Sequence, residues 1–282
     1  MKALSATQVA AWRRDGFLFP LSFLTEQERQ NCLAGLARFE EWLGAPVNAS
    51  KELKWRTMPH LTLPWVTRLT QSPKLLDIIE DLIGPDIFVY TSTFFIKEPH
   101  TDTIAAWHQD STYYGLMPKE EVTVWVALSD ASVEAGCMDV LPFDGGPVQY
   151  PHAAHVVKNS VNRAGQEITV PLDENRAVAM PLKPGQISLH HGMCVHRSGP
   201  NTTDQRRIGL GLNFVPGHVR PIGAHKLAGM LVRGEDKHGY LESVSPPTEE
   251  LSAEAIATHE LAVSRYRDTY FEQEALVARQ GA

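Results

Sequence analysis

Two short stretches of the chain carry side chains that could bind a metal ion. The first is Trp107-His108-Gln109-Asp110, in which one residue separates an imidazole from a carboxylate. On an extended strand, side chains two positions apart point the same way, so His108 and Asp110 can reach the same ion. The pattern alone is weak, because such tripeptides arise often by chance and also fit a surface turn.

The second stretch covers residues 190–201 and contains three histidines, His190, His191 and His196. One of them could complete a set of two imidazoles and one carboxylate on one face of a metal. Such a set leaves coordination positions open and suits non-haem Fe(II) that works with oxygen. The alternative is that these histidines are hydrogen-bonded core or surface groups. Three in seven residues, followed by an Arg-bearing strand, weaken that alternative without removing it.

The composition excludes several other classes of protein. The 282 residues include 26 Lys and Arg against 33 Asp and Glu, a formal charge of −7, which disfavours binding to nucleic-acid phosphates. Cys32, Cys137 and Cys194 are far apart, so neither a disulfide scaffold nor a zinc finger is expected. No stretch approaches the ~20 apolar residues that span a bilayer, and the N-terminus lacks the apolar core of a signal peptide. We therefore expect a cytoplasmic protein with no nucleic-acid or membrane partner.

Helices are expected at both ends of the chain. In residues 1–85, Ser5 with Gln8 and Thr25 with Glu28 fit capping boxes, in which side chains satisfy the free N–H groups of a first helical turn. Residues 216–282 form a C-terminal extension. Its segment 217–245 has no clear pattern, and a long helix is expected to begin after an N-cap at Ser252.

The middle of the chain, residues 86–215, is rich in Val, Thr, Phe and Tyr, with Gly and Pro between short runs. These runs predict strands at 87–97, 122–128, 137–141, 187–190 and 207–215. No helical pattern lies between them, so an antiparallel sandwich or barrel fits better than parallel βαβ units. We expect residues 1–282 to form one domain, with this β core wrapped by terminal helices.

Strand alternation indicates which side chains face the inside of this barrel. In residues 207–215, Arg207, Gly209, Gly211 and Asn213 lie opposite an aliphatic face. Such a polar face fits solvent or an enclosed cavity, and glycines leave room for a ligand to approach the backbone.

The run 122–128 places Trp125 opposite its valines, which indicates that this second face is also enclosed. By the same alternation, Thr91 and Thr93 are expected to line the cavity. Lys97 shares their face and is ambiguous, because a Lys at a strand end usually extends to water.

Ordered motifs over most of the chain carry a family resemblance. They are RRDGFLFPLSFLTEQE, IKEPHTDTIAAWHQD, VTVWVALSDASVEAGCMDVLP and PGQISLHHGMCVHRSGPNTTDQRRIGLGLNFV. The chain resembles the phytanoyl-CoA dioxygenase family of Fe(II)- and 2-oxoglutarate-dependent oxygenases. The resemblance implies a mainly β fold with flanking helices, a cupin-like double-stranded β-helix or jelly roll.

The resemblance also implies roles for individual residues. His108, Asp110 and His196 match the three metal ligands at the centre of the catalytic site. Arg207, eleven residues after His196, matches the Arg that pairs with the distal carboxylate of 2-oxoglutarate, and Ser198 matches a position that often hydrogen-bonds the same group.

Other residues are placed less directly or are set aside. Thr93 is expected beside the co-substrate. His190 and His191 are rejected as the distal ligand because their spacing to Arg207 does not fit the family. Arg206 is rejected because alternation places it with the aliphatic side chains.

The implied cofactor and co-substrates are Fe(II), 2-oxoglutarate and O2, and the implied partner is a small-molecule substrate. Halogenating relatives have Ala or Gly in place of the metal carboxylate, so Asp110 favours hydroxylation, with release of succinate and CO2. The side chains expected to form the substrate pocket are Trp125, Tyr113, Tyr114, Asn213 and Thr91. The same iron chemistry could instead end in desaturation, cyclisation or epimerisation, and a catalytically silent metal-binding barrel is a third alternative. The sequence leaves open whether the protein is a monomer or a homodimer.

Overall fold

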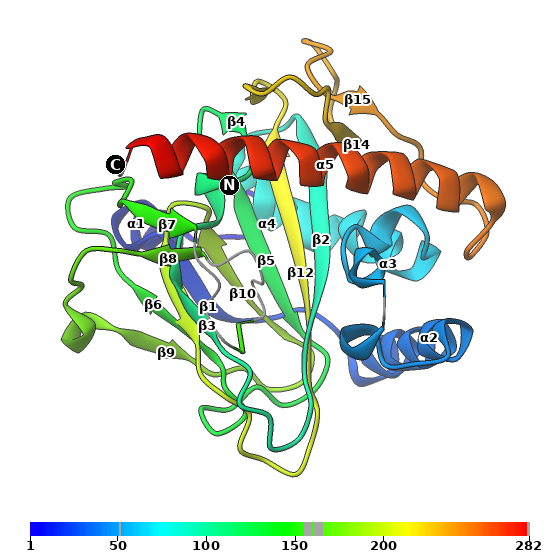
Figure 1. Ribbon diagram of the computed structural model, residues 1–282, viewed down its shortest axis with the longest axis horizontal. Helices are drawn as coiled ribbons and strands as arrows, with labels where there is room; N and C mark the ends of the chain where they lie inside the picture. The colour runs from blue at the N-terminus through cyan, green and yellow to red at the C-terminus, as the bar shows by residue number, and fades with distance from the viewer. Residues whose placement is uncertain (51, 155–158, 161–165, 281–282) are drawn as a thin grey trace.

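The computed structural model describes residues 1–50, 52–154, 159–160 and 166–280, and two facing sheets form its centre (Figure 1). The larger sheet has the strand order β1-β10-β5-β12-β2-β14-β15 and the smaller one the order β3-β11-β6-β9. The strands of the larger sheet are β1 (Phe17–Ser22), β10 (Gln186–His191), β5 (Val122–Ala127), β12 (Arg207–Pro216), β2 (Ile87–Lys97), β14 (Ala228–Arg233) and β15 (Glu242–Ser243). Those of the smaller sheet are β3 (Ala105–His108), β11 (Val195–Ser198), β6 (Met138–Leu141) and β9 (Val178–Met180).

Neighbouring strands of both sheets run antiparallel, except for the short parallel pair β14–β15. Two further antiparallel pairs lie outside the main sheets: β4 (Leu116–Met117) with β13 (Arg220–Pro221), and β7 (His152–Ala154) with β8 (Gln166–Ile168). This arrangement confirms the predicted mainly β fold, a jelly roll with flanking helices.

The helices begin and end where local chemistry satisfies their free backbone groups. They are α1 (Ala6–Asp15), α2 (Glu26–Leu43), α3 (Pro64–Thr70), α4 (Pro73–Ile83) and α5 (Ala253–Gln280). Both predicted capping boxes are present, at Ser5 for α1 and at Thr25 for α2. Gly16 ends α1 with φ 83°, a left-handed conformation that glycine adopts without steric cost.

One hydrophobic core joins residues of all five helices to the outer face of the larger sheet. Leu36 and Phe39 of α2, together with Trp65 of α3, pack against the aliphatic faces of β5 and β12. Successive strand residues point to opposite faces of the sheet. The valines of β5 face the helices, so Thr123 and Trp125 point toward the space between the two sheets.

The helical expectation for residues 1–85 misses β1, which pairs with the edge of β10. The six-residue run FLFPLS is too short for a helix and instead completes the sheet. The unassigned segment 217–245 contains β13, β14 and β15, of which β14 extends the larger sheet beside β2. Short 3-10 turns occur at η1 (Val47–Ala49), η2 (Leu53–Arg56), η3 (Pro59–Leu61), η4 (Asp110–Thr112) and η5 (Glu174–Arg176).

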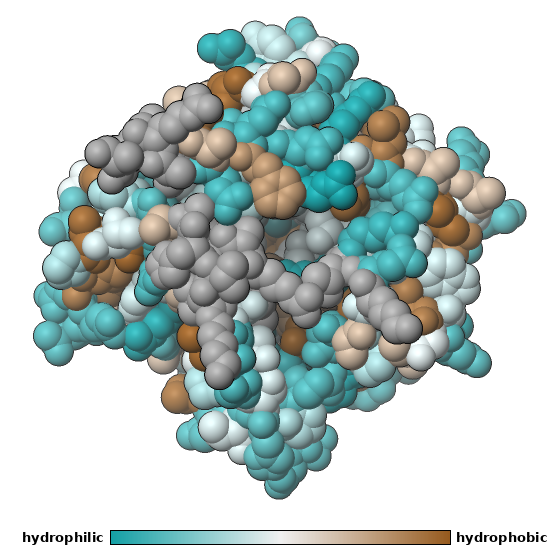
Figure 2. Space-filling view, in the orientation of Figure 1, coloured by the Kyte–Doolittle hydropathy of each residue, from teal (hydrophilic) through white to brown (hydrophobic). Residues whose placement is uncertain are grey.

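The C-terminal helix α5 lies across the β core, beside η3 and β7 (Figure 1). Its residues His259 and Ala262 are buried, while Leu261 and Phe271 are about half exposed. On the face shown in Figure 2, outside the residues drawn in grey, apolar side chains are interspersed with polar ones. No helix in the described part of the chain is long and apolar enough to cross a membrane.

Candidate active site

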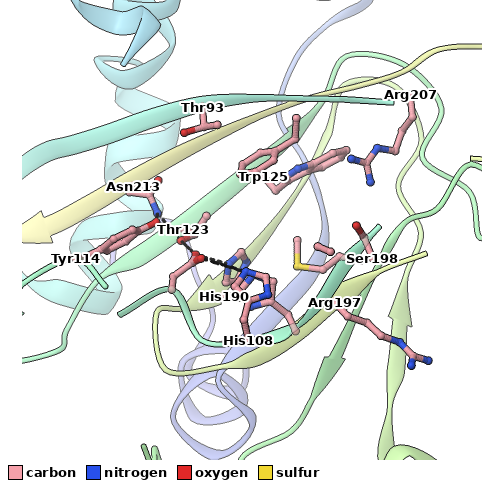
Figure 3. Close-up of a pocket in the computed structure, with 15 residues that line it drawn as sticks. Thr93, His108, Tyr114, Thr123, Trp125, His190, Arg197, Ser198, Arg207 and Asn213 are labelled. Atoms are coloured by element: carbon pink, nitrogen blue, oxygen red, sulfur yellow. Dashed lines mark hydrogen bonds and ion pairs between the residues drawn. The ribbon is translucent and has the colours of Figure 1, made fainter. Parts of the chain in front are cut away.

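A pocket opens between the two sheets, lined by the inner faces of β2, β5, β10 and β12 and by residues of β3, β6 and β11. Its side chains form two polar groups around a cluster of imidazoles (Figure 3). Ser198 and Arg207 lie on one side of this cluster, and Tyr114, Thr123 and Asn213 lie on the other.

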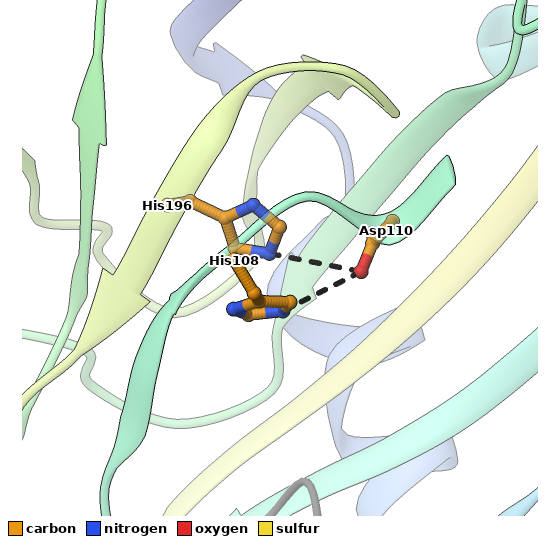
Figure 4. Close-up of side chains that lie close together, drawn as sticks. All are labelled: His108, Asp110 and His196. Carbon is orange, nitrogen blue, oxygen red and sulfur yellow. Dashed lines mark ion pairs between the residues drawn. The ribbon is translucent and has the colours of Figure 1, made fainter. Parts of the chain in front are cut away.

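The three side chains that could bind a metal come together at the base of this pocket (Figure 4). One potential ligand atom from each of His108, Asp110 and His196 lies within 4.8 Å of the others. His108 ends β3 and is paired with His196 of β11, so the sheet register places the two rings side by side. Their Nε2 atoms lie 3.5 and 3.8 Å from Oδ1 of Asp110.

Hydrogen bonds to the backbone orient both rings for metal binding. Nδ1 of His108 lies 2.8 Å from the carbonyl oxygen of Ala106, and Nδ1 of His196 lies 3.0 Å from that of Cys194. A carbonyl only accepts, so each Nδ1 carries a proton and each Nε2 is the ring atom left to bind a metal ion. Burial, together with the neighbouring His108 ring, holds the pKa of His196 well below its usual range, which keeps this ring neutral.

The carboxylate of Asp110 is oriented by two donors on the side away from these rings. The hydroxyl of Thr123 donates to Oδ2 at 3.2 Å, and Nε2 of His190 lies 3.4 Å from the same atom. Oδ1 is thereby turned toward His108 and His196. Burial alone would raise the pKa of Asp110, but the surrounding imidazoles, including the hydrogen bond from His190, outweigh burial and hold the pKa well below its ordinary value.

The residue between the two ligands fixes the turn that separates them. Gln109 is fully buried, and its side-chain amide donates to the carbonyl of Met193 at 2.6 Å. Its backbone N–H donates to Nε2 of His152 at 3.1 Å, while Nδ1 of His152 faces the carbonyl of Tyr150 at 2.8 Å. Burial lowers the pKa of His152 to about 4, so the ring is neutral and Nε2 can accept that hydrogen bond.

This donor set fits a first-row divalent metal ion. Two imidazoles and one carboxylate, all largely buried, form the facial arrangement that non-haem Fe(II) sites use. His190 lies close by, but it contacts the outer oxygen of Asp110 and acts on the ligand rather than as one.

We expect Thr123→Val to weaken metal binding about tenfold, because it removes a donor that orients Asp110 while keeping the side-chain volume. The measurement is a titration with a divalent metal ion. Thr91→Val is the matched control, since among the described residues the Thr91 hydroxyl hydrogen-bonds only the neighbouring Ser92 carbonyl, at 3.5 Å. Equal metal affinity in the Thr123 variant and the unmodified protein would contradict this role.

The other notable group is a pair of buried basic side chains at the Ser198 side of the pocket. Arg207 and Lys97 face each other across β12 and β2, with exposed fractions of 4% and 0%. Lys97 donates to the Ser198 hydroxyl at 2.8 Å and to the Gly199 carbonyl. Burial and the nearby Arg207 lower the pKa of Lys97 to about 6, and burial lowers that of Arg207 to about 10.

This basic pair has no acidic counterpart within the described ranges of the chain. Arg207 donates through Nη1 to the Gly136 carbonyl at 2.6 Å, and its Nε has no partner among the described residues. Buried cations without a counter-ion are costly, so this corner is suited to an anion that arrives from outside. The neighbouring Arg206 is different, because it pairs with Glu40 and Glu98 on the outside of the barrel.

The predicted pocket residues divide into two groups. Thr93, Tyr114, Trp125 and Asn213 line the pocket, together with Thr123 and His190. The described lining does not include Tyr113 or Thr91. Tyr113 instead stacks on Tyr270 of α5 with ring centroids 5.0 Å apart, and Thr91 turns its hydroxyl to the backbone.

The glycines of β12 leave room for protein side chains rather than for a ligand. A Cβ added at Gly209 would lie 1.9 Å from the Trp125 ring, and one at Gly211 would lie 2.8 Å from the Phe95 ring. The sequence interpretation of these glycines as space for a ligand is therefore wrong. They allow two aromatic rings to approach the backbone of the strand closely.

Comparison with known proteins gives a consistent family match. The chain matches the phytanoyl-CoA dioxygenase (PhyH) family over residues 12–209, which is more than half of its length. It is 32% identical over 157 residues to phytanoyl-CoA dioxygenase domain-containing protein 1 of Danio rerio, covering 52% of each chain. It is 25% identical over 167 residues to a probable alpha-ketoglutarate-dependent hypophosphite dioxygenase of Stutzerimonas stutzeri, covering 58% of this chain and 57% of that one.

A solved structure matches over a greater length. The non-heme monooxygenase ThoJ, in its apo form, superimposes with a TM-score of 0.83 at 30% identity, covering 94% of this chain and 98% of that one. By contrast, the chain spans about half the length of the curated relatives it matches.

Proposed function

The chain belongs to the phytanoyl-CoA dioxygenase family, and from that premise we propose that it is an Fe(II)- and 2-oxoglutarate-dependent dioxygenase. It hydroxylates an unactivated C–H bond of a small molecule and releases succinate and CO2. Residues 1–282 act as one domain in this proposal, since β1 from the N-terminal segment and β14 from the C-terminal extension both join the larger sheet.

One observation carries the proposal: three side chains that could bind a metal face the same pocket as a buried guanidinium that has no acidic partner among the described residues. A diacid bound to the metal at its keto-acid end places a second carboxylate some distance away. Arg207 supplies a planar fork for that carboxylate, and Ser198 and Lys97 add a hydroxyl and an amine beside it.

Each part of the site then has a separate task. His108, Asp110 and His196 hold Fe(II), and Arg207 and Ser198 orient 2-oxoglutarate, with Thr93 and Trp125 along its length. Iron with 2-oxoglutarate supplies the capacity to activate O2 and oxidise a C–H bond. The enclosing walls place that bond and exclude water, which prevents side reactions of the oxidant.

The test is succinate formation from 2-oxoglutarate by the purified protein with Fe(II) and air, with and without a broad panel of small molecules. We expect slow turnover without a substrate and faster turnover when one is present. Mass analysis of a converted substrate distinguishes hydroxylation, a gain of one oxygen, from desaturation, a loss of two hydrogens. Absence of succinate under all conditions would support the catalytically silent alternative.

The low pKa of Lys97 predicts that binding of 2-oxoglutarate takes up a proton. With a pKa of about 6, Lys97 is mostly neutral near neutral pH in the protein without co-substrate. A carboxylate beside it favours the charged amine and raises this pKa, so the complex holds more protons than the free protein. The affinity should therefore fall as the pH rises through the pKa of Lys97 in the complex.

Titration calorimetry in two buffers of different ionisation enthalpy measures this proton uptake. The observed heat should depend on the buffer in the unmodified protein and lose that dependence in Lys97→Met. Identical heats in both buffers for the unmodified protein would show that Lys97 does not change its protonation on binding.

A further inference from the structure

A second polar group lies in the pocket, on the side of the metal ligands away from Arg207 (Figure 3). The side-chain nitrogen of Asn213 lies 2.6 Å from the Thr123 hydroxyl and 3.1 Å from the Tyr114 hydroxyl. All three side chains line the pocket, and all three are less than one-tenth exposed.

The direction of each hydrogen bond in this group follows from the charge on Asp110. The ionised carboxylate can only accept, so Thr123 gives it the single hydroxyl proton that Thr123 has. Thr123 must then accept from Asn213, which means that the amide nitrogen, and not the amide oxygen, faces it. The same nitrogen also donates to Tyr114, so both amide hydrogens are used.

Among the described residues, two polar groups in this network each keep a hydrogen-bonding position without a partner. The Tyr114 hydroxyl accepts from Asn213 and has no acceptor for its own proton among the described residues. Burial raises the pKa of Tyr114 well above its usual value, so that proton stays on the oxygen. The amide oxygen of Asn213 likewise has no donor in the described part of the chain.

We propose that the Tyr114 hydroxyl and the Asn213 amide oxygen form a recognition site for an uncharged group of the substrate that both accepts and donates a hydrogen bond, namely an amide or an alcohol. This inference rests on the proposed function and specifies the class of its substrate. The substrate oxygen accepts from Tyr114, and its N–H or O–H donates to Asn213.

Charge argues against other classes of substrate group at this position. An anion would face the amide oxygen of Asn213 and lie close to the carboxylate of Asp110. An ammonium group has no acceptor capacity for the Tyr114 proton. The guanidinium groups that line the pocket within the described residues, those of Arg197 and Arg207, are elsewhere. Arg197 stacks over Trp107 and pairs with Asp139 and Glu174, and Arg207 lies at the opposite side.

Distance argues against occupation of this site by 2-oxoglutarate. Arg207 and Asn213 are six residues apart on β12, which corresponds to about 20 Å along a strand. A five-carbon diacid held by Arg207 and the metal is much shorter than that. The Tyr114–Asn213 site is therefore left for the second organic substrate, next to the metal ligand Asp110.

The test uses the protein loaded with Fe(II) and 2-oxoglutarate without oxygen, and small probes observed by proton NMR. The neutral probes are acetamide and 2-propanol, and the charged probes are acetate and methylammonium. Broadening of probe signals by the paramagnetic ion reports binding beside the metal. We expect the neutral probes to bind more tightly, and Tyr114→Phe to weaken them about five- to tenfold, the value of one hydrogen bond.

Tyr113→Phe is the matched control, because its ring packs against α5 and not into the pocket. Its probe affinities should equal those of the unmodified protein, and melting curves should show that both variants fold. Tighter binding of the charged probes, absence of binding by either neutral probe, or an equal effect of the two variants would each overturn the proposal. Failure of the proposed function is seen separately, as absence of 2-oxoglutarate binding before any probe is added.

Discussion

Replacing His108 by Ala is expected to abolish succinate formation and to weaken Fe(II) binding by more than about 100-fold. Loss of an outer partner of a metal ligand typically costs between 10- and 100-fold in affinity, and loss of a ligand costs more. In this site the effect is compounded. The remaining pair, Asp110 and His196, lies on two different segments, and His108 is the residue that joins β3 to β11 at this position.

The measurement is a metal titration together with 2-oxoglutarate turnover. His100→Ala is the control, because His100 lies on the surface, where it pairs with Asp204 at 2.7 Å. We expect this variant to keep both properties. Undiminished Fe(II) binding in His108→Ala would remove His108 from the ligand set and would require a different imidazole, with His190 the nearest candidate.

Strand alternation predicted much of the pocket, because the side-chain period of two is fixed by backbone geometry. It placed Thr93, Trp125 and Asn213 inside, and it separated Arg207 from Arg206. These assignments needed only to know which alternate side chains of each strand point inward. The aliphatic side chains pack against the helices, so the other set points inward.

Alternation could not decide Lys97, because two local tendencies oppose each other at that position. Alternation directs the Lys97 side chain inward, whereas its charge and its position at a strand end favour contact with water. The structure buries it because Ser198 and Gly199, about 100 residues away in sequence, supply oxygen atoms to the amine. The signal that could have found it is its register opposite Arg207, which only the pairing of β2 with β12 reveals.

Contacts over long sequence separations also explain the different positions of Tyr113 and Tyr114. Both follow the metal motif, and nothing local distinguishes them. Helix α5, some 150 residues later, provides Tyr270 as a stacking partner for Tyr113, while Asn213 of β12 donates a hydrogen bond to the hydroxyl of Tyr114. The sequence set His190 aside as a metal ligand and could not predict its contact with Asp110, because that contact arises from sheet packing.

Replacing Arg207 by Gln should raise the concentration of 2-oxoglutarate needed for half-maximal turnover on the order of 100-fold. Removing one member of a buried charge pair is that costly because the other member, here the distal carboxylate, remains buried without its partner. Lys97→Met should raise the 2-oxoglutarate requirement less, about tenfold. Lys97 is mostly neutral before the ligand binds, and its amine is hydrogen-bonded to the Ser198 hydroxyl beside the expected carboxylate.

Arg206→Gln is a close control for this result. This substitution also removes a guanidinium group, one position earlier in the sequence. The Arg206 guanidinium, however, forms an ion pair with Glu40 at 2.7 Å on the outside of the barrel. Arg206→Gln should therefore lower the melting temperature slightly and leave the 2-oxoglutarate requirement unchanged. Fe(II) titration without co-substrate separates loss of the anion site from loss of the whole pocket, since Arg207 lies to one side of the imidazole cluster. If Arg207→Gln kept the ordinary requirement for 2-oxoglutarate, the buried basic pair would have to serve a different anion.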